Sequence, residues 1–190
     1  MRLLLHICCA PCSVACIRQL RAEGIEPTGF WYNPNIHPVQ EYKQRKNTLT
    51  DYASSIHMPL VVENAYGLRD FIDHVYPDYA ARCAWCYTCR MEETAAYAAA
   101  NGFDAICTTL LISPYQKHEL IRRTGEAAAR AHGIDFLYRD FRPYFKEGQE
   151  EAKALGLYRQ KYCCCIFSEE DRFLEGKKDK VTFQKYRNRG

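Results

Sequence analysis

Ten of the eleven cysteines in this 190-residue chain fall into three short clusters. Cysteine thiolates are soft ligands that bind zinc ions and iron–sulfur clusters. Clusters drawn from three distant parts of so short a chain therefore predict a metal or iron–sulfur centre. The three clusters are Cys8-Cys9-Ala10-Pro11-Cys12 with Cys16 one helical turn later, Cys83-Ala84-Trp85-Cys86-Tyr87-Thr88-Cys89, and Cys163-Cys164-Cys165.

The first cluster comes directly after a short apolar run that reads as a strand. If the strand continued, the adjacent Cys8 and Cys9 side chains would point in opposite directions and could serve two neighbouring centres. The alternative is one ligand and one buried small hydrophobe. Cys12 is expected one residue before a helix, whose N-terminus favours the metal-binding thiolate.

The second cluster repeats every third residue. On a helix, Cys83, Cys86 and Cys89 would stay on one slowly drifting face. C-x-x-C is a chelating spacing for zinc and for iron–sulfur clusters alike. A thioredoxin-type redox motif is the alternative, but that motif usually opens the first helix, and this one lies in mid-chain. Cys89 is left open as a ligand.

The third cluster adds the thiols that raise the total above one simple zinc site. Cys163 and Cys165 lie two apart, so an extended segment would put both on one side and turn Cys164 away. A structural zinc ion needs four ligands, and seven or more well-placed cysteines exceed that number. An iron–sulfur cluster with a second metal would use them. Cys16 and Cys107 are expected to be core residues.

Alternating strand and helix patterns predict how these segments meet. Five predicted strands separated by helices indicate a single-domain α/β fold, with a parallel five-stranded sheet covered by helices on both faces. In such sheets, ligands bind beyond the carboxyl ends of the strands. The strands are expected at 3–7, 26–32, 60–62, 104–112 and 134–138, with helices from about 13 and at 39–57, 68–75, 86–101, 117–132 and 147–155.

Composition limits the classes of function. The chain is 47% hydrophobic with a net charge of +3, which is typical of a globular protein. No apolar run approaches the ~20 residues of a membrane span, and the N-terminal apolar stretch is too short for a signal peptide. A cytoplasmic location is therefore expected, where thiols stay reduced and disulfides are disfavoured. Neither a G-x-x-x-x-G-K-[ST] nor a G-x-G-x-x-G motif occurs, which argues against ATP-driven chemistry.

The domain prediction is a catalytic, metal-binding α/β domain at 1–175 followed by a basic tail at 176–190. The tail carries an excess of cations that could contact phosphates, and a merely solvated terminus is the alternative. Its basic residues, counted from the end of the domain, are Lys177, Lys178, Lys180, Lys185, Arg187 and Arg189.

Five motifs in order give the chain a resemblance to a known family. From about Leu3 to Arg172 it resembles the cobalamin-independent epoxyqueuosine reductases, the QueH family. The motifs are His6-Ile7-Cys8-Cys9-Ala10-Pro11-Cys12, Tyr32-Asn33-Pro34-Asn35-Ile36-His37-Pro38, Arg82-Cys83-Ala84-Trp85-Cys86, Thr108-Thr109-Leu110-Leu111-Ile112-Ser113-Pro114-Tyr115-Gln116 and Tyr158-Arg159-Gln160-Lys161-Tyr162-Cys163-Cys164-Cys165.

The resemblance implies a fold related to the adenine-nucleotide α-hydrolases (HUP-like). It also implies reduction of epoxyqueuosine to queuosine at the wobble position of tRNA, the last step of queuosine synthesis, with two-electron removal of the epoxide oxygen as water. The implied cofactors are a [4Fe–4S] cluster and an adjacent mononuclear metal, iron or zinc. The implied partners are the tRNA and an unidentified electron donor, without ATP or a membrane. The cysteines that match the family's by position are Cys8, Cys9, Cys12, Cys83, Cys86, Cys163 and Cys165.

The loops that follow the strands are expected to surround the modified base above the cysteine centre. Arg45, Lys117 and Arg159 are expected to meet flanking phosphates. The predicted substrate contacts are Asn33, Asn35, Ser113, Gln116, Arg142 and Arg159, and the candidate catalytic proton donors are Tyr32, Tyr115 and Asp140.

Two departures from the family pattern are Cys164, where the family usually has Gly, and Cys89, which is an addition. Glycine at 164 could reflect an unusual backbone angle. Two other classes of function stay open. One is an iron–sulfur-dependent tRNA-thiolating enzyme, which would need ATP and a pyrophosphate-binding loop. The other is a zinc-binding module without catalysis, which metal analysis would distinguish.

Overall fold

A parallel five-stranded sheet organises residues 1–174, the part of the chain that the computed structural model describes. Its strand order is β3-β2-β1-β4-β5, and every pairing is parallel. The predicted sheet is therefore confirmed, whereas the basic tail at 176–190 lies outside the described residues. The strands are β1 Leu3–His6, β2 Thr28–Trp31, β3 Leu60–Val62, β4 Ala105–Thr108 and β5 Asp135–Phe136.

The central strand β1 shows why the sequence forms this sheet. Leu3, Leu4 and Leu5 are all buried, as is expected of a parallel strand that is covered on both faces. Leu4 pairs with Thr28 of β2 on one side and with Ile106 of β4 on the other. Because β1 is the middle strand, the cysteine cluster that follows it lies at the middle of the sheet's carboxyl edge.

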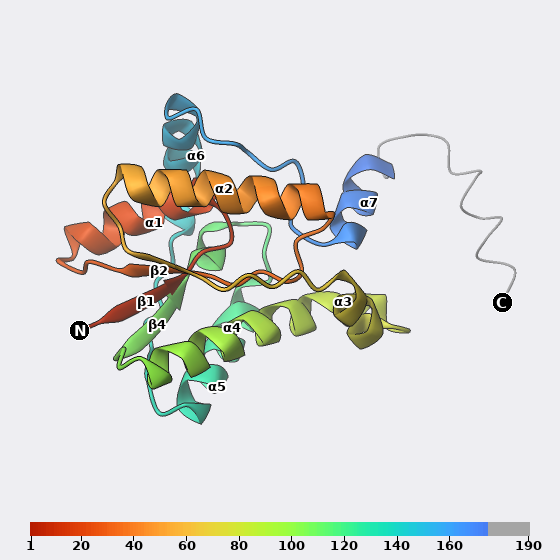
Figure 1. The fold of residues 1–190 in the computed structure, drawn as a ribbon, viewed down its shortest axis with the longest axis horizontal. Helices are drawn as coiled ribbons and strands as arrows, with labels where there is room; N and C mark the ends of the chain where they lie inside the picture. Colours follow the sequence, from red (N-terminus) through yellow and green to blue (C-terminus); the bar gives the residue numbers. More distant parts are fainter. Residues whose placement is uncertain (175–190) are drawn as a thin grey trace, which may run out of the picture.

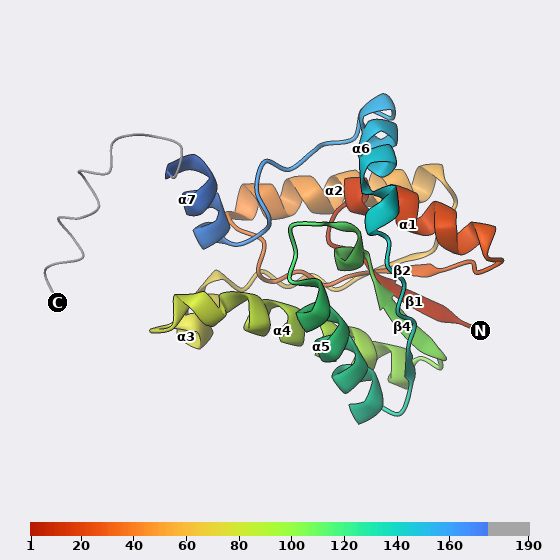
Figure 2. The ribbon, with the colours of Figure 1, turned by 180° about the vertical axis from the view of Figure 1, so that it is seen from behind.

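Helices cover both faces of the sheet, as predicted. Figures 1 and 2 show α1, α2 and α6 on one face and α4 and α5 on the other. No helix within residues 1–174 is long and apolar enough to span a membrane. The helices are α1 Ala10–Ala22, α2 Val39–Ser55, α3 Leu68–Val75, α4 Arg82–Ala100, α5 His118–Ala131, α6 Phe145–Ala154 and α7 Ile166–Leu174, with 3₁₀ turns η1 Tyr79–Ala81, η2 Thr109–Ile112 and η3 Arg142–Tyr144.

The start of α1 differs from the prediction. The helix begins at Ala10 rather than near residue 13, with Cys9 at its N-cap and Pro11 in its first turn. Proline is well tolerated there because its missing N–H has no helical partner to lose. Cys12 therefore lies inside the first turn and not before it.

Two further elements differ from expectation. The predicted strand at 104–112 ends at Thr108, and its second half is the 3₁₀ turn η2. No pattern in the sequence predicts α7, which begins directly after the third cysteine cluster. Both differences lie at the carboxyl edge of the sheet, where the cysteines gather.

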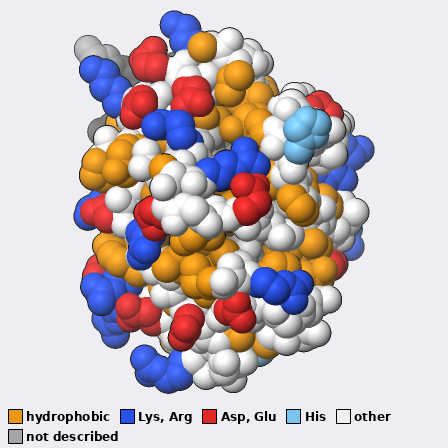
Figure 3. Space-filling model, turned by 90° about the vertical axis from the view of Figure 1, so that its left-hand side faces the viewer, with side chains coloured by type: hydrophobic (Ala, Val, Ile, Leu, Met, Phe, Trp, Pro, Cys, Tyr) orange, Lys and Arg blue, Asp and Glu red, His pale blue; other side chains and the backbone are white. Residues whose placement is uncertain are grey.

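Charge is mixed on the face at the other end of the strands. Figure 3 views the molecule from the side of the N-terminus, and acidic and basic side chains alternate across that face.

Close packing of α1 on α6 holds the first cysteine segment against the chain that leads to the third. A Cβ atom added at Gly148 of α6 would lie 2.8 Å from the Cβ of Ala15 in α1. The Ala15 methyl group cannot rotate away because it is fixed to the helix backbone. The two helices would have to separate instead.

We predict that Gly148→Ala destabilises the protein by about 1–3 kcal/mol, because over-packing costs more than the alanine's helix propensity returns. Urea unfolding followed by circular dichroism measures the change. Ala15→Gly in the same chain removes the opposing methyl group, so the double variant should regain part of the loss. A Gly148→Ala protein more stable than the parent would contradict this packing.

Candidate metal and substrate site

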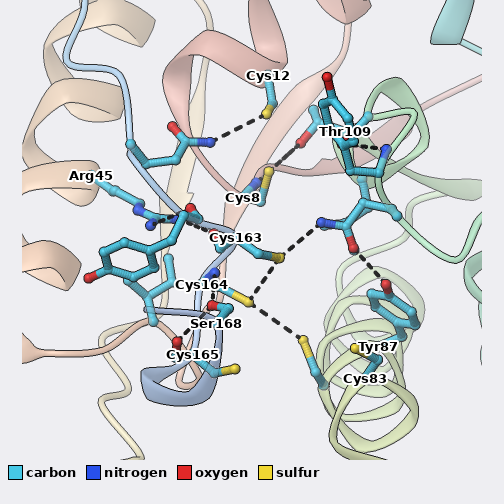
Figure 4. Close-up of a pocket in the computed structure, with 18 of the residues that line it drawn as sticks. Cys8, Cys12, Arg45, Cys83, Tyr87, Thr109, Cys163, Cys164, Cys165 and Ser168 are labelled. Carbon is cyan, nitrogen blue, oxygen red and sulfur yellow. Dashed lines mark hydrogen bonds between the residues drawn. The ribbon is translucent and has the colours of Figure 1, made fainter. Parts of the chain in front are cut away.

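Cysteines from all three clusters line one cavity of about 650 Å³. Figure 4 shows Cys8 and Cys12 on one side of it, Cys163 and Cys164 near its middle, and Cys83 on α4 across from them. Six of the seven predicted ligands line this cavity, and the seventh, Cys9, lies against Cys8. The lining cysteines are Cys8, Cys12, Cys83, Cys86, Cys163, Cys164 and Cys165.

Cys8, Cys9 and Cys12 form the first thiol group. Their Sγ atoms all lie within 4.8 Å of one another, and those of Cys8 and Cys9 are 3.8 Å apart. The expectation that Cys8 and Cys9 point in opposite directions is therefore wrong, because β1 ends at His6 and Cys9 already caps α1. Gln160 Nε2 donates to Cys9 Sγ at 3.1 Å.

Hydrogen bonding within this group favours the thiolate form of Cys8. Hydrogen bonds with Cys12 and Cys9 hold the pKa of the Cys8 thiol well below its usual range. Hydrogen bonds with Cys8 and Cys9 hold the pKa of the Cys12 thiol well above its usual range. A metal ion requires deprotonated thiols, so it would replace the shared protons that now bind these sulfurs together.

Cys86, Cys163 and Cys164 form the second thiol group. Cys164 Sγ lies 3.9 Å from Cys86 Sγ and 3.6 Å from Cys163 Sγ. The expectation that Cys164 turns away from its neighbours is wrong, because residues 161–165 form a bend before α7 and not an extended segment. Hydrogen bonding with Cys164 lowers the pKa of Cys163 to about 7.

Cys165 and Cys83 border the second group. Cys165 lines the cavity but also packs with Phe71 and Val75, and hydrogen bonding with Cys164 lowers its pKa to about 6. Cys83 is half-buried, and burial raises the pKa of its thiol. Both remain within the set of thiols that a centre in this cavity could use.

The remaining cysteines stay outside the cavity. Cys16 and Cys107 are buried in the main apolar cluster, which confirms their predicted place in the core. Cys89 is not a lining residue, and its thiol faces the carbonyl oxygen of Cys86 at 3.6 Å. Burial raises the pKa of Cys89 to about 12, so this thiol stays protonated.

Arg90 is a buried cation whose guanidinium group is paired with a cysteine sulfur. Its Nη2 donates to Cys86 Sγ at 2.7 Å, and its Nη1 lies 3.4 Å from Asn33 Oδ1. None of its hydrogen-bond partners among residues 1–174 is a carboxylate. A fully buried guanidinium is costly unless it is paired, so its position favours an anionic thiolate or an anionic cluster beside Cys86.

Arg45 fixes the third cysteine segment to α2. Its Nη1 donates to the carbonyl oxygen of Cys163 at 2.5 Å, and its Nε donates to Glu41 at 2.7 Å. Tyr158 donates to the other oxygen of Glu41 at 2.6 Å. Arg45 is buried, so the expectation that it meets phosphate on the rim is wrong. Removing one partner of such a buried pair typically costs about 3–5 kcal/mol.

The cavity wall is strongly cationic. Seven of its lining residues are lysine or arginine, and none of those found within residues 1–174 is acidic. A concave surface of one charge focuses the electric potential and attracts anions. This wall contrasts with the mixed face at the other end of the sheet. The cations are Arg45, Arg82, Arg90, Lys117, Arg159, Lys161 and Arg172.

Five residues predicted to contact the substrate or to act on it line the cavity: Ser113, Tyr115, Gln116, Lys117 and Arg159. Gln116 links the wall to the centre, because its Nε2 donates to Cys163 Sγ at 3.0 Å. Tyr115 is 86% exposed. The loop after β4 therefore approaches the thiols as the topology predicts.

Two predicted substrate contacts are buried beneath the cavity instead. Asn33 Nδ2 donates to the carbonyl oxygen of Ile7, which holds the loop after β2 against β1. Asn35 Nδ2 donates to Cys86 and Cys164. Neither asparagine is a lining residue, so both hold the structure of the site in place and neither is positioned to contact the substrate.

Tyr32, Asp140 and Arg142 are not brought to the cavity. Tyr32 packs against the apolar cluster on the α4 side of the sheet. Asp140 accepts from Arg142 at 2.6 Å, and that guanidinium lowers the pKa of the carboxyl to about 2. A carboxylate that stays ionised near neutral pH is a poor proton donor.

The sequence did not predict how three residues contribute to the site: Arg90 and Gln160 are not among the expected site residues, and Arg45 is expected only as a phosphate contact. Arg90 lies four residues after Cys86, a helical spacing that could have indicated a shared face. Arg45 and Gln160 gave no such signal, because their contacts join segments more than a hundred residues apart.

Comparison with known proteins assigns the chain to a family. The model of the family "Epoxyqueuosine reductase QueH" matches residues 3–171. The chain is 36% identical to the epoxyqueuosine reductase QueH of Dehalococcoides mccartyi, over 90% of this chain and 94% of that protein. For the proteins of the same name from Acinetobacter baylyi and Thermotoga maritima, identity is 36% and 34%, over 90% and 87% of this chain and 81% and 88% of theirs. The chain belongs to the QueH family of epoxyqueuosine reductases.

Proposed function

We propose that this protein reduces epoxyqueuosine in tRNA to queuosine. The reaction takes two electrons and two protons, breaks both carbon–oxygen bonds of the epoxide, restores the carbon–carbon double bond and releases water. Family membership over nearly the whole described chain supports this activity. The observation that carries it is the joining of thiols from three distant segments with four exposed cations, Lys117, Arg159, Lys161 and Arg172, around one cavity.

The donor set fits the cofactors proposed for this site, a [4Fe–4S] cluster and an adjacent mononuclear iron or zinc ion. Sulfur donors suit both, and the thiols around the cavity exceed the four of a structural zinc site. Buried Arg90 would balance the negative charge of such a centre. When bound, the centre supplies the electrons of the reduction. The proposed ligands are Cys8, Cys9, Cys12, Cys83, Cys86, Cys163 and Cys165.

The cationic wall suits a tRNA substrate. Arg159 is exposed on it and is placed to meet phosphates beside the modified nucleotide. The target base must leave the anticodon-loop stack to enter this cavity. Tyr115 and Phe145, whose rings are 5.9 Å apart, lie at the lining and offer a surface on which a neighbouring base can stack.

Protons for the departing oxygen are proposed to come from Lys117 Nζ, because Lys117 lines the cavity close enough to Cys83 for its charge to act on that thiol. Tyr87 also lines the cavity, and its hydroxyl donates to Gln116 Oε1 at 2.6 Å. Burial raises the pKa of Tyr87, so this phenol keeps its proton and serves to orient Gln116. Gln116 in turn donates to Cys163 Sγ, which fixes the wall beside the thiols. Tyr115 is exposed and is assigned to base stacking instead.

The cellular setting follows from the chemistry. A substrate tRNA and a set of free thiols both fit the cytoplasm, where thiols stay reduced. A separate protein or small molecule must deliver the electrons, and the reaction as balanced above has no role for ATP.

We predict that anaerobically reconstituted, reduced protein converts epoxyqueuosine in tRNA to queuosine without ATP or cobalamin. Nuclease digestion and mass spectrometry of the nucleosides should show a loss of one oxygen atom. Conversion should weaken steeply with added salt, because phosphate contacts release counterions on binding. At least two chemical reductants should be tried, so that a poor donor is not mistaken for an inactive enzyme.

Three outcomes would contradict this function. The first is fully metallated, reduced protein that leaves the epoxide intact with every reductant. The second is conversion that requires ATP, which would move the chain toward tRNA thiolation. A colourless protein with stoichiometric zinc and no acid-labile sulfide would favour a binding module.

The proton source gives a separate prediction. Lys117→Met should lower the single-turnover rate at saturating tRNA by about 100-fold or more, the usual range for loss of a general acid. Iron content should stay unchanged, because Lys117 is not one of the proposed ligands.

Arg159→Met is the matched comparison. It should weaken tRNA binding and reduce the salt slope by about 1, with little effect on the saturated rate. If Lys117→Met instead behaves like Arg159→Met, Lys117 is a phosphate contact and the proton comes from elsewhere.

A further inference from the structure

Cys164 occupies a position that spacing alone assigned to no role. Its Sγ lies between two thiols from different parts of the chain, 3.9 Å from Cys86 and 3.6 Å from Cys163. It is the sulfur that joins α4 to the segment before α7. Figure 4 shows it at the centre of the second thiol group, facing the cavity.

These separations match those of ligands that share an ion. With metal–sulfur bonds near 2.3 Å, two thiolates on one tetrahedral ion lie about 3.8 Å apart. Both Cys164 separations fall close to that edge length. Removing Cys164 from the group would leave Cys86 and Cys163 without a common sulfur neighbour.

A buried amide supports the same pair of sulfurs. Asn35 Nδ2 donates to Cys86 Sγ at 3.0 Å and to Cys164 Sγ at 3.1 Å. Asn35 is fully buried, and its Oδ1 has no hydrogen-bond partner among the described residues. The amide nitrogen thus donates to both sulfurs, while the amide oxygen of the same side chain accepts no hydrogen bond from the described residues. Donors held against ligating atoms in this way orient metal ligands and strengthen their binding.

The backbone at position 164 is not in a conformation that only glycine adopts. Within residues 1–174, His57 is the only non-glycine residue with a positive φ. The bend at 161–165 therefore does not require glycine at this position, and the thiol is an addition that the backbone accepts without cost.

We propose that the Cys164 thiolate is a metal ligand in this protein, acting with Cys86 and Cys163. The inference rests on the proposed function only for the identity of the metal. It adds an eighth cysteine to the seven ligands assigned above. Asn35 is the positioning residue for the pair formed by Cys86 and Cys164.

The test compares Cys164→Gly and Cys164→Ala with the parent chain. Apoprotein is loaded anaerobically with Co²⁺, and the sulfur-to-cobalt charge-transfer absorption is measured, since its intensity rises with the number of bound thiolates. In parallel, reconstituted protein is assayed for iron, for acid-labile sulfide and for the rate of iron release to a chelator. Cys107→Ala is the control, because Cys107 is equally buried but lies in the core away from the cavity.

Both Cys164 variants should show weaker charge-transfer absorption and release iron at least tenfold faster, whereas Cys107→Ala should match the parent. Agreement between the glycine and alanine variants would separate loss of the thiol from loss of backbone rigidity. Should either variant fold poorly by circular dichroism, Cys164→Ser keeps the side-chain volume and takes its place.

Parent-like absorption and iron release in the Cys164 variants would overturn the proposal and make Cys164 a packing residue. The cobalt measurement is independent of catalysis. A parent protein that reduces no epoxyqueuosine, but whose cobalt spectrum depends on Cys164, would contradict the proposed function and leave this inference standing.

Discussion

Charge balance is the constraint on which the rest of this structure depends. Thiols from three segments crowd one cavity, and they can bind metal only as thiolates. Arg90 supplies positive charge from inside the protein, because it donates directly to Cys86 Sγ. Arg45 has Glu41 as its counter-ion, and it holds the backbone of Cys163 in place. Without buried cations, so many negative sulfurs would repel one another and draw water into the core.

The sheet topology brings these parts together. Because the strands are parallel, the loops after β1 and β4 lie at the same edge of the sheet. Cys83 and Cys86 reach that edge from α4, which lies on the face of the sheet opposite α1 (Figure 1). The third cysteine segment arrives from α6 and ends at α7, beside the N-terminal end of α2 where Arg45 lies (Figure 1). At the carboxyl ends of the strands, cysteine thiols and cationic side chains thus line the same cavity. The face at the other end of the strands carries mixed charge (Figure 3).

The sequence predicted the sheet and the gathering of cysteines well, because both depend on local patterns. Buried strands such as Leu3–His6 are continuous apolar runs, and parallel connections leave few possible topologies. Contacts that depend on the bend at 161–165 were not predictable from the sequence. The alternation of an extended segment predicts that the Cys164 side chain points away from Cys163, whereas the two sulfurs lie close together. Tyr32, Asp140 and Arg142 follow strands as expected, but side-chain direction and the Asp140–Arg142 ion pair keep them from the cavity.

Anomalous diffraction at the iron absorption edge is the most direct test of the proposed iron–sulfur centre, which these three segments would hold together. Crystals of protein purified without oxygen should give strong iron peaks inside the cavity, bordered by sulfurs of Cys8 and Cys12 on one side and of Cys86 and Cys163 on the other. Absence of iron peaks from protein that retains full activity, or iron bound away from these sulfurs, would contradict the account.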